Sequence, residues 1–439
     1  MDYECVFTQN ATHALRLIAD MIDWGKYGGK CVLLDINHTS MVGLGHALDK
    51  KGLDLSIVDE QGLTSILSNS SHIRSSHDHE PHSDTTFHVL LYPAQCNFSG
   101  TRYPLAWTRQ FQNQSSLNPH IKSFVVLDCA SYASTSPINI SQDCPADFIP
   151  ISLYKLFGYP TGIGCLFIRR TILPWLKPRD FFGGGTVEHI ELSLHLGISH
   201  IALRGSTMPA LWTNIAEQFE DGTLPFQQII AIEPAIHLFR TLFGSMHCVA
   251  SYCAYLTKRC AEALSTLKHY NNQRLVKFLT RNVKSYGDVY TQGPILTFLL
   301  KRADGSNIGY AEVERLATLE TLHLRVGGLC NPGARQRYLQ LTTEDLNEER
   351  VQGKICGDDF DHIDGKPTGA IRISFGPCTL YDVECQKLIS FLNKYFLEST
   401  PPSTFSKIVP RHEEFWVKEI RVCKPMYDDS LDFYAYRSN

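Results

Sequence analysis

The strongest constraint on the fold is a series of short apolar runs that do not alternate with polar residues. The runs are KCVLLDI (30–36), FHVLLYPA (87–94), SFVVLDCA (123–130), DFIPIS (147–152) and IGCLFIRR (163–170). Continuous apolar runs are typical of strands that are covered on both faces. A helical spacing of apolar residues over 11–22 precedes the first run. We therefore expect an α/β fold in which helices sandwich a mainly parallel sheet.

The second half of the chain has a different pattern. Residues 225–268 have helical periodicity, and a shorter set of strands and helices follows, from GPILTFLLKR (293–302) to YDVECQKLISFLNKYFLES (381–399). This set predicts a smaller α+β domain, followed by the linker-like segment TPPSTFSKIVP. We expect a large domain over residues 1–240, a small domain over 241–399, and a linker with a tail over 400–439.

Composition excludes several classes of protein. The 439 residues are 43% hydrophobic and 20% charged, as in globular proteins, and the formal net charge of −4 gives no basis for binding nucleic acid. No apolar run reaches transmembrane length, and the N-terminus lacks a signal-peptide pattern, so we expect a cytoplasmic protein without a membrane partner. The 14 cysteines show no C-x-x-C spacing, which favours free thiols in a reducing compartment.

A histidine-rich segment, SNSSHIRSSHDHEPHSDTT (68–86), raises the question of a metal site. Its histidines are His72, His77, His79 and His82. Imidazoles are common metal ligands, but polar tracts of this composition are far more often solvated loop insertions. We therefore predict no metal site.

Four chemically different polar residues follow the predicted strands. They are His38 after VLLDIN, Asn97 after VLLYPAQ, Asp128 at the end of FVVLD, and Lys155 after FIPIS. In an open parallel sheet, ligands bind beyond the carboxyl ends of the strands, which meet at one edge. Burying an ammonium without a partner is costly. Lys155 is therefore either a surface residue on a turn or a residue that takes part in chemistry.

An anion site is predicted at the start of the first helix. FTQNATHAL puts Asn10, Ala11 and Thr12 there, where free N–H groups and the helix dipole attract negative charge. Thr12 and Ser152 could add hydroxyl donors, although Thr12 alone is most simply a helix N-cap and Asp128 alone a strand-end cap. A phosphate site, a carboxylate and a lysine at one edge indicate pyridoxal 5'-phosphate. Its aldehyde condenses with a lysine, and an acid keeps its ring nitrogen protonated.

Longer motifs extend this prediction to a family. They are LLYPAQCNFSGTRYPLAW, DFIPISLYKLFGYPTGIGCLFIRR, FFGGGTV, FEDGTLPF, LRVGGLCNPGA and CGDDFDHIDGKPTGAIRISFG. In this order, over residues 2–398, the chain resembles the cysteine-desulfurase domain of eukaryotic molybdenum cofactor sulfurases, within the class V aminotransferases. The resemblance implies pyridoxal-phosphate fold type I. NFSGTRYPL and KLFGYPTG indicate this subfamily, as does Ser131, where general desulfurases carry glutamine.

The resemblance also implies a role for each residue of the predicted cofactor site. Lys155 would hold the cofactor covalently, and Asp128 would pair with its pyridine nitrogen. His38 would stack on the ring and could move a proton, while Asn97 would donate to the phenolic oxygen. The phosphate would be held by Thr12, Ser152 and the backbone at Asn10 and Ala11.

Three further residues complete the implied site. Thr223, in EDGT, would reach the phosphate bound to the partner subunit, so the active unit would be a homodimer. Arg372, in AIRISFG, would bind the substrate carboxylate through its two-pronged guanidinium. Considered without its motif, GGLCNPGA, Cys330 would be interpreted as an inert loop thiol. In this motif it is expected to be the sulfur-accepting nucleophile on a flexible loop.

The implied reaction is the desulfuration of free L-cysteine. Lys155 or His38 would remove the α-proton, and Cys330 would attack the substrate sulfur, leaving alanine and a persulfide on Cys330. In the resembled family the sulfur passes to the molybdenum cofactor, which activates xanthine dehydrogenase and aldehyde oxidase.

Two parts of the family pattern are not found in the sequence. One is an N-terminal segment with a YLDHAGA-like motif. The other is the C-terminal MOSC domain, of which only WVKEIRVCKPM (416–426) resembles the first strand. We therefore expect either a shortened gene product or the product of an incomplete gene model. Two alternatives stay open: an impaired homologue that acts as a cofactor-binding or dimerisation module, and a different class V lyase or transaminase. Cys330 argues against a transaminase, which needs no such thiol, and alanine release from L-cysteine would identify an impaired homologue.

Overall fold

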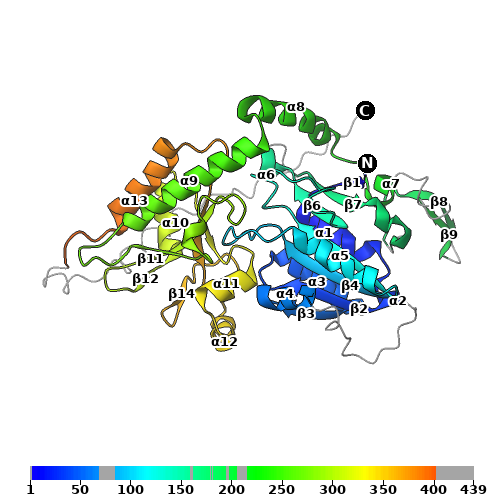
Figure 1. Cartoon of the computed structure of the whole chain (residues 1–439), viewed down its shortest axis with the longest axis horizontal. Helices are drawn as coiled ribbons and strands as arrows, with labels where there is room; N and C mark the ends of the chain where they lie inside the picture. Colours follow the sequence, from blue (N-terminus) through cyan, green and yellow to red (C-terminus); the bar gives the residue numbers. More distant parts are fainter. Residues whose placement is uncertain are drawn as a thin grey trace, which may run out of the picture. The chain divides into compact units, whose positions relative to one another are not determined.

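The computed structural model describes residues 2–68, 85–158, 162–177, 179, 181–193, 197–204 and 215–401. Its larger sheet has seven strands, in the order β1 (Tyr3–Thr8), β7 (Gly164–Arg169), β6 (Phe148–Ser152), β5 (Ile121–Asp128), β4 (Thr86–Pro93), β2 (Gly29–Leu34) and β3 (Asp54–Val58). The strands from β6 to β3 are parallel, and β7 is antiparallel to both of its neighbours. β1 therefore shares the direction of the parallel strands. The expected α/β fold with a mainly parallel sheet is confirmed (Figure 1).

Helices cover both faces of this sheet. They are α1 (Ala11–Met21) and α3 (Thr39–Lys50) on one face, and α4 (Glu60–Ser68) and α5 (Ala106–Leu117) on the other. The alternating side chains of β2 enter two separate cores, with Cys31 and Leu33 on the α1 side and Val32 and Leu34 on the other. Because neither face meets water, the strand is apolar throughout its length.

The two strands that the sequence patterns missed lie at the edges of this sheet. β1 contains both buried and half-buried residues, and β3 contains no fully buried residue. An edge strand has a neighbour on one side only and is less covered. Such strands therefore lack the long apolar run that identifies an interior strand.

A second sheet is antiparallel. Its strands are β10 (Val276–Phe278), β11 (Ile295–Lys301), β16 (Ala370–Ser374) and β13 (Arg325–Gly327), in that order, with β12 (Asn307–Ile308) paired to β11. A third core joins this sheet to three helices, α9 (Met246–Thr266), α10 (Tyr310–Leu319) and α13 (Gln386–Phe396). The predicted set of α and β elements is therefore present.

The remaining described elements connect or flank the two sheets. The helices are α2 (Trp24–Tyr27), α6 (Tyr154–Phe157), α7 (Ile215–Phe219), α8 (Phe226–Phe243), α11 (Pro332–Leu339) and α12 (Thr343–Val351), and the short strand pairs are β8 (Val187–Ser193) with β9 (Gly197–Leu203) and β14 (His362–Ile363) with β15 (Lys366–Pro367). No single helix in the described part of the chain is long and apolar enough to cross a membrane. The pair α8 and α9, bent by 60°, meets that criterion only jointly and by length and composition.

Met1–Leu397 forms one compact unit, and Glu398–Asn439 forms a second. The expected boundary between residues 240 and 241 stays a prediction. Most of the predicted tail, from residue 402 onward, lies outside the described residues, as do residues 69–84 of the histidine-rich segment. Among the residues that are described, no group of three histidine, cysteine or acidic side chains is arranged to hold a metal ion.

Candidate active site

The polar residues predicted at the strand ends follow strands that share one direction. Asp128 is the last residue of β5, and Ser152 is the last residue of β6. His38 and Asn97 lie just beyond β2 and β4, and Lys155 lies on α6, directly after β6. The carboxyl ends of parallel strands meet at one edge of a sheet. The observed strand directions therefore give these residues a common edge, while their individual roles stay predictions.

The start of α1 is built against the same edge. The side chain of Asn10 caps the helix, because its oxygen accepts a hydrogen bond from the N–H of His13 at 3.0 Å. The N–H of Ala11 donates to Oγ of Ser152, also at 3.0 Å. A Cβ at Gly164, the first residue of β7, would lie only 2.8 Å from Cα of Asn10. Glycine at 164 therefore lets the positive end of α1 pack directly on the ends of β6 and β7.

The imidazole of His38 is tied to this helix start through Ser40. Nδ1 of His38 accepts from the N–H of Ser40 at 3.1 Å. The Ser40 hydroxyl lies 3.0 Å from that nitrogen and 2.7 Å from Oγ1 of Thr12. Since Nδ1 accepts from a backbone N–H, the neutral ring carries its proton on Nε2. His38 is thereby arranged to donate through Nε2, while its lone pair is occupied by Ser40.

Three charged residues act on His38. Burial lowers the pKa of its imidazole, the carboxylate of Asp128 raises it, and the positive charges of Lys155 and Arg372 lower it again. Such effects require the groups to be near one another. The structure therefore brings together residues that lie as far apart in sequence as positions 38 and 372.

Asp128 and Lys155 differ in their surroundings. Asp128 is 8% exposed, and its Oδ1 accepts from the N–H of Ala130 at 2.8 Å, whereas Oδ2 has no hydrogen-bond partner among the described residues. Lys155 is exposed and has neither a hydrogen bond nor an ion pair within the described part of the chain. One oxygen of the carboxylate is thus fixed by the backbone, while the amine is free to react.

Arg372, on β16, is hydrogen-bonded to the backbone of Asn97. Nη1 of Arg372 donates to the carbonyl of Asn97 at 2.7 Å, and its Nε is buried without a partner in the described chain. Burial lowers the pKa of this guanidinium, and the thiols of Cys96 and Cys330 act in the opposite direction. An orphaned, buried N–H of a guanidinium suits a carboxylate ligand.

Cys330 lies on a turn whose backbone is held by hydrogen bonds. Leu329 and Cys330 both adopt left-handed backbone conformations, with φ of 55° and 53°. The Cys330 carbonyl accepts from the N–H of Thr39 at 2.8 Å and from its hydroxyl at 3.0 Å. The side chain of Asn97 donates to the Leu329 carbonyl at 2.7 Å and accepts from Nδ2 of Asn331 at 2.8 Å. The expected flexible loop is therefore a short turn held on both sides, and the amide expected to face the cofactor is bonded to that turn.

The sequence analysis missed three residues of this arrangement. Ser40 and Thr39 follow His38 directly, and Asn331 follows Cys330. Asn331 is the N-cap of α11, with Pro332 at its first position, a pairing that is readable from sequence as a helix start. No comparable local signal predicts that Thr39 would contact a residue 291 positions away.

These groups fit pyridoxal 5'-phosphate. The positive end of α1 with the Ser152 hydroxyl suits a phosphate, and the free oxygen of the buried Asp128 carboxylate suits a protonated ring nitrogen. The unpaired amine of Lys155 suits an aldehyde. The orphaned Nε of Arg372 leaves a separate position for the carboxylate of an amino acid. The amide of Asn97 fits less simply, because the Cys330 turn already uses both of its polar atoms.

Thr223 lies apart from these residues, exposed on a turn beside β1. The side chain of Glu220 accepts from the N–H of Phe7 on β1 at 2.7 Å, and Asp221 forms a two-pronged ion pair with Arg179, with both N–O distances at 2.7 Å. This pairing fixes the turn and leaves the Thr223 side chain at the surface.

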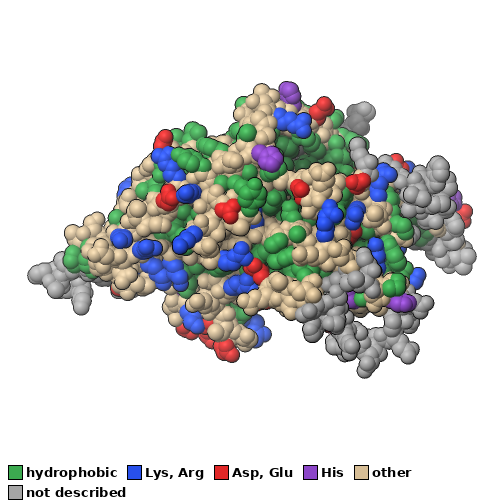
Figure 2. Space-filling view, viewed as in Figure 1, with side chains coloured by type: hydrophobic (Ala, Val, Ile, Leu, Met, Phe, Trp, Pro, Cys, Tyr) green, Lys and Arg blue, Asp and Glu red, His purple; other side chains and the backbone are tan. Residues whose placement is uncertain are grey.

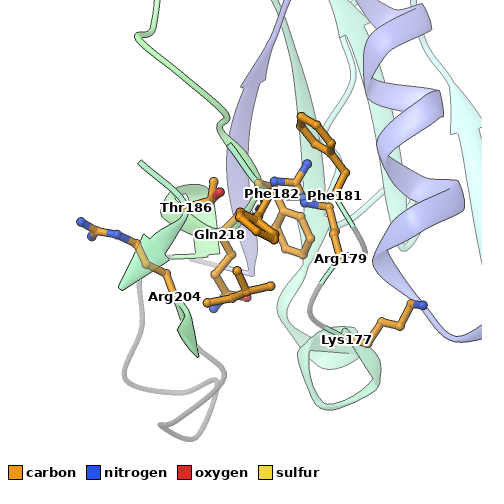
Figure 3. Close-up of a pocket in the computed structure, with 9 residues that line it drawn as sticks. Lys177, Arg179, Phe181, Phe182, Thr186, Arg204 and Gln218 are labelled. Carbon is orange, nitrogen blue, oxygen red and sulfur yellow. Dashed lines mark hydrogen bonds between the residues drawn. The ribbon is translucent and has the colours of Figure 1, made fainter. Parts of the chain in front are cut away.

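A small pocket next to that turn is lined by several basic side chains. Figure 3 shows Arg204 and Lys177 directed away from each other on opposite sides of the pocket, with Phe181 and Phe182 near Arg179. Arg179 is bonded to Asp221, and Arg204 is paired with Glu217. The positive charges are thus neutralised or divergent, and none of the predicted site residues lines this pocket.

Comparisons with known proteins identify the family to which the chain belongs. A family model described as "Aminotransferase class-V" matches residues 1–287. The molybdenum cofactor sulfurase of Danio rerio is 33% identical over 90% of this chain and 46% of its own length. That of Homo sapiens is 36% identical over 87% of this chain and 42% of its own length, and that of Anopheles gambiae is 34% identical over 94% and 52%. The chain thus spans about half the length of the curated relatives it matches.

Solved structures share the fold at lower identity. An apo cysteine desulfurase from Thermococcus onnurineus NA1 superposes with a TM-score of 0.61 at 19% identity, covering 89% of this chain and 78% of that one. The Escherichia coli cysteine desulfurase CsdA gives a TM-score of 0.59 at 17% identity over the same shares. Both similarities concern the fold.

Proposed function

Since the chain belongs to the class V aminotransferase family, we propose that it is a pyridoxal 5'-phosphate-dependent L-cysteine desulfurase that moves sulfur onto Cys330. The observation that carries this proposal is the set of hydrogen bonds by which Asn97 joins Arg372 to the Cys330 turn. The effects of Asp128, Lys155 and Arg372 on the pKa of His38 support it. The Cys330 turn is bonded to Thr39, the next residue along. An amine, an acid, a carboxylate receptor and a thiol at one place are the groups that this reaction requires.

The cofactor, when bound, would supply an electron sink for the electron pair released at the α-carbon of the substrate. Lys155 would hold it and then act as the base at the α-carbon, because the lone pair of His38 is occupied by Ser40. Asp128 would keep the ring nitrogen protonated through its free oxygen. Arg372 would orient the substrate carboxylate with the Nε that has no partner in the described chain.

The sulfur-transfer step balances without an external oxidant or reductant. The thiolate of Cys330 attacks the sulfur of L-cysteine, an S–S bond forms, and the Cβ–S bond of the substrate breaks. A proton then replaces sulfur on the carbon, which gives alanine and a persulfide on Cys330. The left-handed turn supports this role, since it holds the backbone of Cys330 against Thr39 at the start of α3, next to His38 in the sequence.

We further propose the molybdenum cofactor as the sulfur acceptor, on the strength of the names of the relatives. Its recipients would then be xanthine dehydrogenase and aldehyde oxidase, as the sequence resemblance implies. A reducing, cytoplasmic compartment is proposed because every cysteine that the structure describes is a free thiol.

A homodimer is also proposed. Thr223 is exposed on a turn that Glu220 and Asp221 fix, which suits contact with a phosphate in a second subunit. Helix α8, which follows this turn, carries several exposed large apolar side chains. Figure 2 shows hydrophobic surface next to α8 on the face turned to the viewer.

Two variants test the desulfurase proposal directly. Lys155→Ala should remove the visible absorption of the cofactor-loaded protein, because the covalent attachment is lost. Cys330→Ser should keep that absorption and release no alanine from L-cysteine. Lys50→Ala, on α3, and Cys356→Ser, at an exposed cysteine, serve as matched controls that should behave as wild type.

The measurements are absorption spectra after loading, alanine release, and mass spectrometry of the Cys330 peptide for an added sulfur. A wild-type protein that binds the cofactor and forms no alanine would support the impaired homologue instead. Persulfide formation on a cysteine other than Cys330 would refute the assigned nucleophile.

A further inference from the structure

We propose that Asn331 is a positioning residue that fixes the thiol of Cys330 through its bond to Asn97. This inference deepens the proposed desulfurase function and rests on it. Asn331 is 1% exposed, and its two side-chain ends have different partners. Oδ1 accepts from the N–H of Ala334 at 3.0 Å and caps α11, whereas Nδ2 donates to Oδ1 of Asn97 at 2.8 Å and, more weakly, to Sγ of Cys96 at 3.6 Å.

The contact between the two amides decides which way the amide of Asn97 faces. Asn331 donates, so the oxygen of Asn97 must point toward it, and the nitrogen of Asn97 must then point toward the Leu329 carbonyl, to which it donates at 2.7 Å. A chain of two hydrogen bonds therefore closes around Cys330, from the residue after it to the residue before it. We call Asn97 and Asn331, with these two bonds, the amide latch.

The turn needs such a restraint because its backbone is strained. Leu329 and Cys330 are consecutive non-glycine residues with positive φ, which side chains with a Cβ rarely adopt. Strained conformations persist only when surrounding contacts hold them. The bond from Thr39 to the Cys330 carbonyl holds one point of the turn, and the amide latch holds the residues on either side.

The amide latch also links the thiol to the predicted carboxylate receptor. The carbonyl of Asn97 accepts from Nη1 of Arg372 at 2.7 Å, so one residue contacts both Arg372 and the Cys330 turn. A substrate held by Arg372 would therefore meet Cys330 in a fixed relative position. In transfer between two sulfur atoms, the rate depends on this alignment.

Asn331→Asp separates the latch from the helix cap. Aspartate caps helices as well as asparagine does, but its carboxylate cannot donate to Oδ1 of Asn97. The amide of Asn97 would turn its nitrogen toward the introduced carboxylate, and the Leu329 carbonyl would lose its donor. Thr342→Ala is the matched control, because it removes the N-cap of the neighbouring helix α12 without touching the latch.

The first readout is alkylation of the apoprotein by iodoacetamide, followed at the Cys330 peptide by mass spectrometry. Release of the half-buried turn should raise the rate at Cys330 about tenfold, while the rates at exposed Cys356 and Cys378 stay unchanged as internal references. In an Asn97→Ala background, Asn331→Asp should have no further effect, since Asn331 acts through Asn97. An unchanged Cys330 rate in Asn331→Asp would overturn the proposal.

The second readout is steady-state alanine formation by the loaded enzyme. Asn331→Asp should lower kcat about tenfold with KM for L-cysteine within about twofold, because substrate binding is retained and the attack is misaligned. Faster alkylation with an unchanged kcat would overturn the positioning role. If the wild type forms no alanine, the proposed function fails. The alkylation rates then still decide whether Asn331 fixes Cys330.

Discussion

Asn10 combines two roles that a single substitution can separate. Its side chain caps α1, and its backbone belongs to the proposed phosphate site. Asn10→Ala removes the cap and should lower the free energy of unfolding by about 1 kcal/mol. Asn10→Asp keeps the cap but adds a negative charge where the phosphate would bind.

We therefore expect Asn10→Asp to retain the thermal midpoint of wild type and to bind pyridoxal 5'-phosphate about tenfold more weakly, owing to like-charge repulsion. Thermal unfolding of the apoprotein and titration with the cofactor measure the two effects separately. Equal cofactor affinity in Asn10→Asp and wild type would contradict a phosphate site at this helix start.

His38 offers a test by pH. Its folded pKa is lowered, chiefly by burial, so the ring stays neutral below about pH 6.5, where an exposed histidine becomes charged. The stability that comes from the neutral ring is present above about pH 6.5 and is lost as pH falls through the lower, folded pKa. NMR titration of the apoprotein, assigned by comparison with His38→Asn, should give a midpoint below about 6.5.

Two further variants use the neighbouring charges of His38. Asp128→Asn should lower the His38 midpoint further, because that carboxylate raises the pKa, and Lys155→Met should raise it, because that ammonium lowers it. Identical midpoints in all three proteins would show that the three groups do not share a site.

At the scale of elements, Gly333 determines how α11 packs beside the end of β2. A Cβ at this position would lie 2.0 Å from the carbonyl oxygen of Asp35, which follows β2. Gly333→Ala should therefore push the first turn of α11 away and move the Cys330 turn that precedes it. We expect a loss of roughly 1–3 kcal/mol in stability, as for other overpacked sites, together with faster alkylation of Cys330.

Gly43→Ala, inside α3, is the control for this substitution. Nothing lies within 4 Å of its Cβ, so the change should stabilise the helix by about 0.5–1 kcal/mol. Thermal midpoints and the Cys330 alkylation rate measure both variants. Wild-type behaviour of Gly333→Ala would mean that α11 tolerates a shift and does not set the position of the turn.

The elements also show what could be predicted from sequence. Interior strands such as β4 were identified because both of their faces are covered, which leaves a continuous apolar run. The half-covered edge strands β1 and β3 lacked that signal. His38, Asp128 and Lys155 each follow a predicted parallel strand, and this was enough to predict that they lie at one edge of the sheet. The contact between Thr39 and Cys330 depends on how segments 291 residues apart pack, which no local pattern encodes.

At the scale of the whole molecule, the site requires both sheets. Lys155 and Asp128 follow strands of the parallel sheet, while Arg372 lies on the antiparallel one. The core between the parallel sheet and helices α4 and α5 also includes Leu299 of β11 and Ala370 of β16, so apolar packing joins the two sheets. The polar contacts of Asn97 with Arg372 and Asn331 add to this connection. The residues proposed to orient the substrate and to accept its sulfur therefore lie in a different part of the chain from those proposed to hold the cofactor.

We expect two chains to associate through helix α8. Phe226, Ile230, Leu238 and Leu242 recur at multiples of four along α8 and are 56–72% exposed. A stripe of large apolar side chains on one helix typically marks an interface, and α8 follows directly on the Thr223 turn. Ile230→Glu with Leu242→Glu should therefore shift the protein from dimer to monomer in sedimentation velocity. Leu319→Glu with Val351→Glu, at sites on α10 and α12 that are 78% and 76% exposed, should leave the dimer intact. A wild-type protein that sediments as a monomer would contradict the proposed dimer.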